Sequence, residues 1–295
     1  MKTPRFLVTT AGLLSLLLAR PSLAAEPSGE KFPEAEAPPL GVLPTSEDAL
    51  IDPKMARSWG VLPPRAFIST TMDFGFVYLR PRASIGYGRP FTSWIGVDAN
   101  PILQTSGLGA YGGLRIEVPH LDWRIGPRYF FSFEHTHLPP QDSYERIDFE
   151  RVVANRARTT TWETELDLSA DLGPGRLLLR GSLSYVTGVP DGKNVFEETL
   201  HVIVAPPWVW RTRVAYGYVF GSHHQHSLGM AVDFLDVPKR DDSLTVRVGP
   251  LLSMKLSRRV EVRGSFVFSV ISPDKLGLKG GDSTELGLRY RWASE

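Results

Sequence analysis

The chain has 295 residues, with 33 Lys and Arg against 32 Asp and Glu and a formal charge of +1. This balance lacks the basic excess of a nucleic-acid-binding protein and excludes such a partner. The chain has no cysteine, so it forms no disulfide and carries no lipid on an N-terminal cysteine. After the first 24 residues no run of about 18 apolar residues occurs, which argues against membrane-spanning helices.

Residues 1–24 have the organisation of a secretory signal peptide. Lys2 and Arg5 precede an apolar stretch, 6–18, that is too short to span a bilayer. Small residues in Ser22-Leu23-Ala24 predict cleavage after Ala24, with the next bond as the alternative. Cleavage removes three basic residues and no acid, leaving 30 basic against 32 acidic residues and a formal charge of about −2. The alternative interpretation is a buried N-terminal helix.

Residues 25–64 are rich in proline and acidic side chains and poor in large apolar ones. Such a segment cannot bury enough apolar surface to offset the entropy lost when it is ordered. We expect an extended tail before a folded domain, or a plug that occupies the domain.

From residue 65 onward, apolar and polar side chains alternate with the period of a β-strand. The clearest segments are 68–78, 121–134, 160–171, 210–220, 245–255, 260–270 and 285–292. The alternation is weaker in 83–97, 107–118, 176–187, 196–205 and 226–235. The chain therefore belongs to the all-β class.

Most of these segments contain 10 to 15 residues, whereas strands of soluble proteins average about 5–6 and tilted membrane strands about 9–11. Aromatic residues near the strand ends suit the two interfaces of a membrane. They are Tyr78, Trp94, Phe133, Tyr185, Trp210, Phe220, Tyr290 and Trp292. Alternation alone does not distinguish inside from outside, so a soluble sandwich or lipocalin-like barrel is the alternative.

The final segment, Glu285-Leu-Gly-Leu-Arg-Tyr-Arg-Trp292, has one apolar face and one charged face. With Gly287, Tyr290 and Trp292 it resembles the C-terminal β-signal of the bacterial outer-membrane β-barrel superfamily. The resemblance implies a transmembrane antiparallel up-and-down barrel over residues 65–295, in contact with outer-membrane lipid. It also implies export, periplasmic chaperones and the barrel-assembly machinery, with 25–64 as a periplasmic segment or plug. Residues 293–295 extend beyond the usual terminal aromatic.

The segments add up to about twelve strands, the even number expected of a bacterial single-chain barrel. One feature conflicts with this count. The shortest connections, such as Pro119-His120, follow odd-numbered strands, where longer external loops are expected. A break at Gly88-Arg89-Pro90 would correct the order but would produce thirteen strands.

The polar face of the strands carries charges of both signs. Candidate lumen-lining residues are Glu163, Glu165, Asp167, Arg211, Arg213, Arg124 and Arg128. The acidic strand at 157–172 and the basic strand at 209–220 lie about four strands apart in this count. Two interpretations stand: the charges neutralise one another in a closed lumen, or they create a transverse field in a narrow pore.

Histidines are the residues that suggest chemistry. His135 and His137 form one pair, and His223, His224 and His226 form a second group. In a twelve-strand count both groups lie at the same rim, and either could bind a divalent transition metal. Neither group has a carboxylate pattern that completes a site, so we expect solvated histidines, no metal and no cofactor.

Outer-membrane lipid hydrolases place a histidine two residues before a nucleophilic serine, and no such His-x-Ser occurs here. The sequence therefore shows no local catalytic arrangement and favours a protein that is not an enzyme. It predicts a small porin-like channel for passive or weakly selective solute passage in the bacterial outer membrane. The alternatives are a closed barrel that serves as an anchor or scaffold, and a lipid hydrolase.

Overall fold

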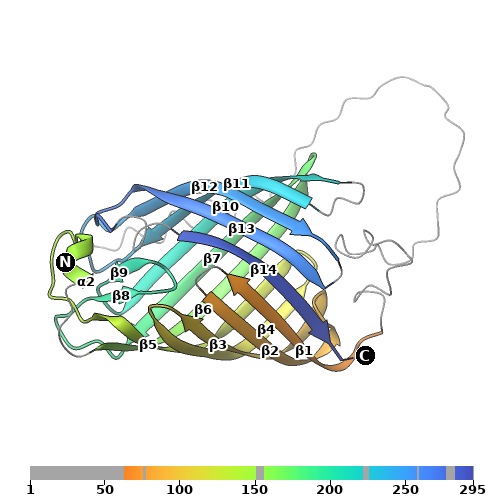
Figure 1. Ribbon diagram of the computed structural model, residues 1–295, viewed down its shortest axis with the longest axis horizontal. Coiled ribbons are helices and arrows are strands. Elements are labelled where there is room, and N and C mark those ends of the chain that lie inside the picture. The colour runs from red at the N-terminus through yellow and green to blue at the C-terminus, as the bar shows by residue number, and fades with distance from the viewer. Residues whose placement is uncertain are drawn as a thin grey trace, which may run out of the picture. The chain divides into compact units, whose positions relative to one another are not determined.

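The computed structural model describes residues 63–75, 78–150, 156–221, 226–257, 259–276 and 283–294. The signal peptide at 1–24 and nearly all of the segment 25–64 lie outside these residues. Twelve of the described strands form a closed antiparallel barrel, in which each wall strand pairs with the wall strands before and after it in the chain and β14 pairs with β1 (Figure 1). The predicted all-β up-and-down barrel of about twelve strands is confirmed.

Twelve of the described strands make up the wall of the barrel. They are β1 (Arg65–Gly75), β2 (Tyr78–Arg89), β3 (Ser93–Gln104), β4 (Gly107–Val118), β5 (Leu121–Thr136), β6 (Arg156–Leu172), β7 (Gly175–Thr187), β10 (Trp208–Phe220), β11 (His226–Asp236), β12 (Thr245–Lys255), β13 (Val260–Ile271) and β14 (Ser283–Ala293). A short helix, α2 (Arg146–Glu150), lies between β5 and β6, and a hairpin of β8 (Val195–Glu197) and β9 (Val202–Val204) lies between β7 and β10. No helix in the described part of the chain is long and apolar enough to cross a membrane.

The strand number is correct because two errors in the sequence prediction cancel. The segment 83–97 is not one strand, since β2 ends at Arg89 and β3 begins at Ser93 after a tight turn in which Phe91 has a φ of 64°. The segment 196–205 is not a wall strand, since it forms the β8–β9 hairpin. Its Val202-Ile203-Val204 run is buried on every side, and a continuous apolar run does not separate a wall strand from a packed hairpin.

With these boundaries Pro119-His120 and most other short connections follow even-numbered strands of the wall, as expected. One end of the barrel, here called the turn end, carries the short connections 90–92, 119–120, 173–174, 221–225 and 256–259. The other end, here called the loop end, carries the long connections 137–155, 188–207, 237–244 and 272–282, together with two connections of two residues each, 76–77 and 105–106. Both ends of the wall, Arg65 and Ala293, lie at the turn end.

Burial shows which face of each strand points inward. Asp233 and Arg247 are almost fully enclosed, with 0% and 1% of their surface exposed, whereas Ile85 and Val270 are 60% and 61% exposed. The polar set of each alternating strand thus faces the interior and the apolar set faces outward. A soluble barrel has the reverse distribution, so the lipocalin-like alternative does not describe this chain.

Among the aromatic residues of the predicted belts whose side chains the structure describes, Trp94 departs from an interfacial position. Trp94 points into the barrel, where it is buried and its indole Nε1 donates a hydrogen bond to Glu117 over 2.9 Å. The Arg115 guanidinium lies 5.5 Å from its ring centroid. Trp94 falls on the inward side because β3 begins after the turn at Pro90, which fixes the phase of the strand.

A charged cavity inside the barrel

The β8–β9 hairpin enters the barrel from the loop end. Its apolar side chains pack on inward-facing residues of four wall strands. The cluster consists of Val195, Leu200, Val202, Val204 and Ala205 from the connection, and of Ala157, Val186, Val209, Leu235 and Val237 from β6, β7, β10, β11 and the residue after β11. Each fully buried aliphatic side chain contributes about 1.5–3 kcal/mol, so the hairpin is a packed part of the fold.

Polar contacts attach the same hairpin to the wall. Arg128 on β5 donates a hydrogen bond from Nη1 to Glu197 over 2.7 Å. On the opposite wall, Arg247 of β12 donates to the carbonyl oxygens of Leu200 and His201 over 2.8 and 2.6 Å. Burial would raise the pKa of the Glu197 carboxyl, but Arg128 and hydrogen bonds from Thr199 outweigh it and hold the pKa below its usual value.

Loops cover the outer side of the hairpin. Phe196 and Ile203 pack against Leu138, Tyr144 and Leu276, which come from the connections after β5 and β13. A buried ion pair joins two of the loops, because Arg240 donates to both carboxylate oxygens of Asp274 over 2.7 and 2.8 Å. The hairpin is thus held between the wall on one side and the loops on the other.

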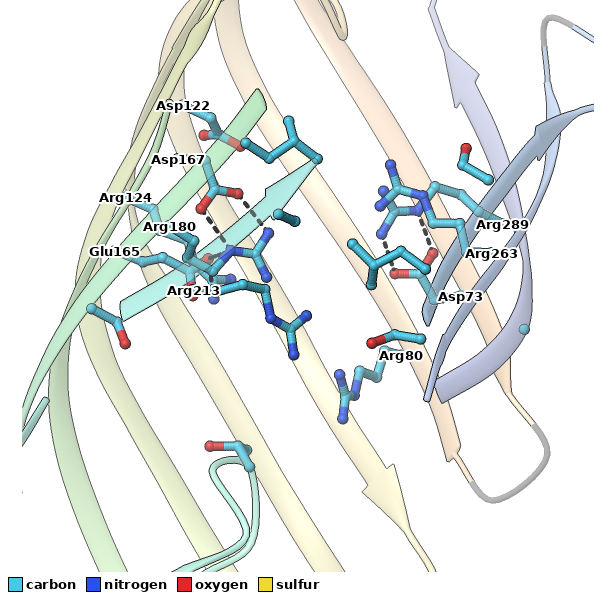
Figure 2. A pocket seen from close by; sticks show the side chains of 18 of the residues that line it. Asp73, Arg80, Asp122, Arg124, Glu165, Asp167, Arg180, Arg213, Arg263 and Arg289 are labelled. Carbon is cyan, nitrogen blue, oxygen red and sulfur yellow. Dashed lines mark hydrogen bonds and ion pairs between the residues drawn. The ribbon is translucent and has the colours of Figure 1, made fainter. Parts of the chain in front are cut away.

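A cavity of about 560 Å³ lies in the barrel and reaches Thr199 and Leu200 in the turn of the hairpin. Figure 2 shows charged side chains that project into it from opposite walls. Eleven arginines and six carboxylates are among the described residues that line it. The arginines are Arg80, Arg82, Arg115, Arg124, Arg128, Arg180, Arg211, Arg213, Arg263, Arg289 and Arg291, and the acids are Asp73, Glu117, Asp122, Glu163, Glu165 and Asp167.

On one wall, the acidic strand β6 lies between two basic strands. Arg124 on β5 contacts Glu165 over 3.1 Å, and Arg128 contacts Glu163 over 2.9 Å. From the other side, Arg180 of β7 donates to both oxygens of Asp167 over 2.6 Å. The sequence predicts the acidic and basic strands about four strands apart, but only β7 separates β6 from β10, because 196–205 is not a wall strand.

Arg211 and Arg213 on β10 both form ion pairs with Asp233, a residue that the sequence does not predict for the lumen. Both guanidinium groups bind the Asp233 carboxylate of β11, Arg211 over 2.6 Å. The Asp233 side chain has no exposed surface. Arg211 and Arg213 thus share one buried carboxylate, that of Asp233.

Ion pairs of the same kind lie on β1, β13 and β14, where the barrel closes. Arg289 of β14 binds Asp73 of β1 over 2.5 and 2.8 Å, which joins the last strand to the first. Glu261 of β13 accepts from Arg263 over 2.6 Å and from Arg291 over 3.2 Å. Glu261 is 6% exposed, whereas Arg263 is 49% exposed.

All seven residues selected from the sequence as lumen candidates are among those that line this cavity. Asp73, Arg180, Asp233 and Glu197 are not among the residues that the sequence predicts for the lumen. The first three lie at inward positions of their strands, so the period of two could have indicated them once the phase was known. The alternation of inward and outward residues could not indicate Glu197, because β8 is not part of the wall.

The histidines do not meet at one rim. His137 follows β5 at the loop end, whereas His226 begins β11 at the turn end, and the prediction of a shared rim is wrong. A shared rim requires 196–205, which lies between the two groups in the sequence, to be a wall strand, and it is not one. His223 and His224 lie outside the described residues. No group of three or more His, Asp or Glu that could hold a metal occurs in the part of the chain that the structure describes.

One serine and one histidine do come together. His120, in the turn between β4 and β5, lies with Nδ1 3.3 Å from the hydroxyl of Ser169 on β6, at an exposed position of the turn end. Within the described residues, no hydrogen bond or ion pair joins a carboxylate to His120. The orienting acid of a serine nucleophile is therefore not part of this arrangement.

The fold and the cavity define a closed β-barrel with a charged interior and an apolar exterior. No protein-family profile matches the chain, and no curated protein matches it. Among solved structures it is similar to a KdgM porin in complex with disordered oligogalacturonate, with 10% identity, 76% of this chain and 98% of that chain covered, and a TM-score of 0.39.

A NanC porin is similar over 78% of this chain and 98% of its own, with 8% identity and a TM-score of 0.36. The outer membrane protein OmpT of Vibrio cholerae, as a loop L8 deletion mutant, is similar over 77% of this chain and 97% of its own, with 8% identity and a TM-score of 0.35. These similarities are too remote to carry an argument about function, which rests on the geometry of this chain.

Proposed function

We propose that the protein is a small porin-like channel of the bacterial outer membrane, through which small solutes pass passively or with weak selectivity. The observation that carries this proposal is the distribution of side chains across the wall. Apolar residues of the twelve strands are exposed on the outside, and charged residues line a cavity on the inside. A contiguous apolar exterior of this extent is typical of a membrane contact, and a polar lumen is typical of a pore.

The two ends of the barrel support an orientation. Bacterial barrels have short turns on the periplasmic side and longer loops outside. In this proposal the turn end, with Arg65 and Ala293, faces the periplasm, and the loop end faces the exterior. A signal peptide at residues 1–24 exports the chain, and residues 25–64 remain in the periplasm or enter the lumen.

The assembly partners follow from the last strand. Tyr290 and Trp292 lie on the outward face of β14, opposite Met72 and Thr70 of β1, and Gly287 pairs with Gly75. In this proposal the strand is the docking signal for the barrel-assembly machinery, after delivery by periplasmic chaperones.

The β8–β9 hairpin favours a second candidate, a closed barrel that acts as an anchor or scaffold. It occupies the lumen between several wall strands and the covering loops. We prefer the channel, because charged side chains outnumber apolar ones among the described residues that line the cavity below the hairpin. A lumen that needs only to be filled is stabilised as well or better by apolar residues.

Single-channel recording separates the two candidates. The refolded mature chain, shown to be inserted by its heat-modifiable migration, is placed in planar bilayers. Discrete conductance steps, altered by Arg211→Glu, support a channel whose wall includes β10. The matched control is Lys239→Gln, since Lys239 is exposed in the loop 237–244 and does not line the cavity. A folded, inserted protein with no conductance would establish the closed scaffold instead.

A further inference from the structure

The charges of the cavity are sorted by depth. Eleven arginines and six carboxylates line it within the described part of the chain. Four further carboxylates, Asp98, Asp233, Glu197 and Glu261, pair with lining arginines but do not line the cavity themselves. Their side chains are at most 6% exposed. The arginines that pair with Asp98, Asp233 and Glu261 are 12–49% exposed, so their guanidinium groups stand in front and these three carboxylates stand behind them. Arg128 is buried together with Glu197, with 3% and 2% of their side chains exposed.

This layering has an electrostatic consequence. Taken together, the eleven arginines and ten carboxylates nearly cancel, which limits the repulsion that a wall of bare cations would create. At short range, however, a solute lies closer to the guanidinium groups than to the four hidden acids. The surface that a solute meets thus carries an excess of positive charge, although these 21 residues together have a formal charge of only +1.

The acidic residues that do face the cavity are compensated locally. Glu163, Glu165 and Asp167 all lie on β6 and each is paired with an arginine of β5 or β7. By contrast, Asp233 forms ion pairs with both Arg211 and Arg213, and Glu261 forms ion pairs with both Arg263 and Arg291. In each of these two sets, one hidden carboxylate stands behind two guanidinium groups that line the cavity. Figure 2 shows Arg213 and Arg263 extending into the cavity from two different strands of the wall, β10 and β13.

We infer that the channel prefers anions, and that the solutes it passes are small organic molecules with carboxylate, phosphate or sulfate groups. This inference rests on the proposed function. Arginine presents a planar fork of donors that matches an oxyanion in a bidentate manner, and the cation set of this cavity consists only of arginine in the described residues. A cavity of about 560 Å³ lies in the range of sites that hold small molecules.

The test is the reversal potential of the refolded mature protein in planar bilayers under a gradient of dilute KCl. A unit charge about 10 Å from an ion in water changes the local concentration of that ion roughly twofold, in opposite directions for anion and cation. We therefore expect wild type to favour Cl⁻ and Arg213→Gln to lower the Cl⁻ to K⁺ permeability ratio by about fourfold. Arg213→Gln/Arg263→Gln lowers it further, and Lys239→Gln leaves it unchanged.

The two arginine variants are chosen so that the barrel still folds. Arg213→Gln leaves Arg211 on Asp233, and Arg263→Gln leaves Arg291 on Glu261, so neither buried acid loses its last cation. In a second arm, citrate, inorganic phosphate and inorganic sulfate are added in turn to the wild-type channel, with sucrose as the neutral control. Reduced Cl⁻ current with the oxyanions and not with sucrose supports oxyanion binding, and the order of their effects distinguishes carboxylate from phosphate and sulfate.

The outcomes separate the two proposals. A conducting channel with no preference or a preference for K⁺ overturns the anion inference and leaves the channel function intact. Anion preference that survives Arg213→Gln/Arg263→Gln overturns the assignment to these arginines. Silence from a folded, inserted protein overturns the channel function, and the anion inference with it.

Discussion

The Arg128 guanidinium on β5 donates a 2.7 Å hydrogen bond to Glu197 on β8, and only 3% and 2% of these side chains are exposed. This contact connects the barrel wall to the hairpin in its lumen. Arg128 also binds Glu163 over 2.9 Å, so one cation is shared by a wall carboxylate and a hairpin carboxylate. The position of the hairpin is thereby coupled to the charges that line the cavity.

The first prediction concerns this pair. Arg128→Met leaves the buried Glu197 and the half-buried Glu163 without their main cation, and we expect the free energy of unfolding to fall by about 3–5 kcal/mol. Urea unfolding of the refolded protein in lipid measures this change. Arg128→Met/Glu197→Gln removes one of the unpaired anions and should recover part of the loss. An unchanged stability in Arg128→Met would show that Arg128 does not hold the hairpin.

The second prediction is a pH dependence of the hairpin. Because the folded pKa of Glu197 lies below the ordinary value of 4.5, its ionised form stabilises the fold. The contribution is complete above pH 4.5 and is lost as the pH falls through the depressed folded pKa. We expect protease cleavage within the hairpin to increase only in that acidic range. In Glu197→Gln this transition is missing, and a transition identical to wild type would assign it to another group.

Much of the wall is predictable from the sequence, because inward and outward residues alternate with a period of two and one face is apolar. That pattern alone places Arg124, Arg128 and the acids of β6 on the polar side of the wall. It could not place Glu197, since β8 is buried on all sides and has no polar face from which to tell which way its residues point. Nor could it pair Arg289 with Asp73, because that contact depends on the register at which β14 closes on β1.

The third prediction tests which face of the wall meets lipid. Leu166 on β6 points outward and is 37% exposed. Leu166→Arg places a charge on that face, and we expect it to reduce folding stability by about 2–4 kcal/mol if the site lies near the bilayer midplane. Leu166→Ala, which removes the side chain without adding a charge, should have a smaller effect. Equal stabilities of Leu166→Arg and Leu166→Ala in lipid vesicles would show that this face does not contact hydrocarbon.

The fourth prediction concerns the loops that cover the hairpin. Asp274→Ala leaves the buried Arg240 guanidinium without its carboxylate and breaks the link between the connections 237–244 and 272–282. We expect faster trypsin cleavage in these loops, while the barrel keeps its heat-modifiable migration. The matched control is Asp241→Asn, since Asp241 is exposed in the same connection. If both variants resist trypsin as wild type does, the ion pair is not what holds the loops together.

The last prediction separates the assembly role of β14 from a general need for outward aromatics. Tyr290→Ala/Trp292→Ala removes two aromatic side chains from the closing strand, and we expect the chain to accumulate in the periplasm without forming heat-modifiable barrels. Tyr185→Ala/Trp208→Ala removes another outward pair, whose rings lie 4.8 Å apart on β7 and β10. That control loses a comparable amount of apolar surface far from the C-terminal strand, so its insertion should continue. Equal defects in the two variants would assign the loss to the lipid interface, and normal insertion of Tyr290→Ala/Trp292→Ala would exclude a docking role for these residues.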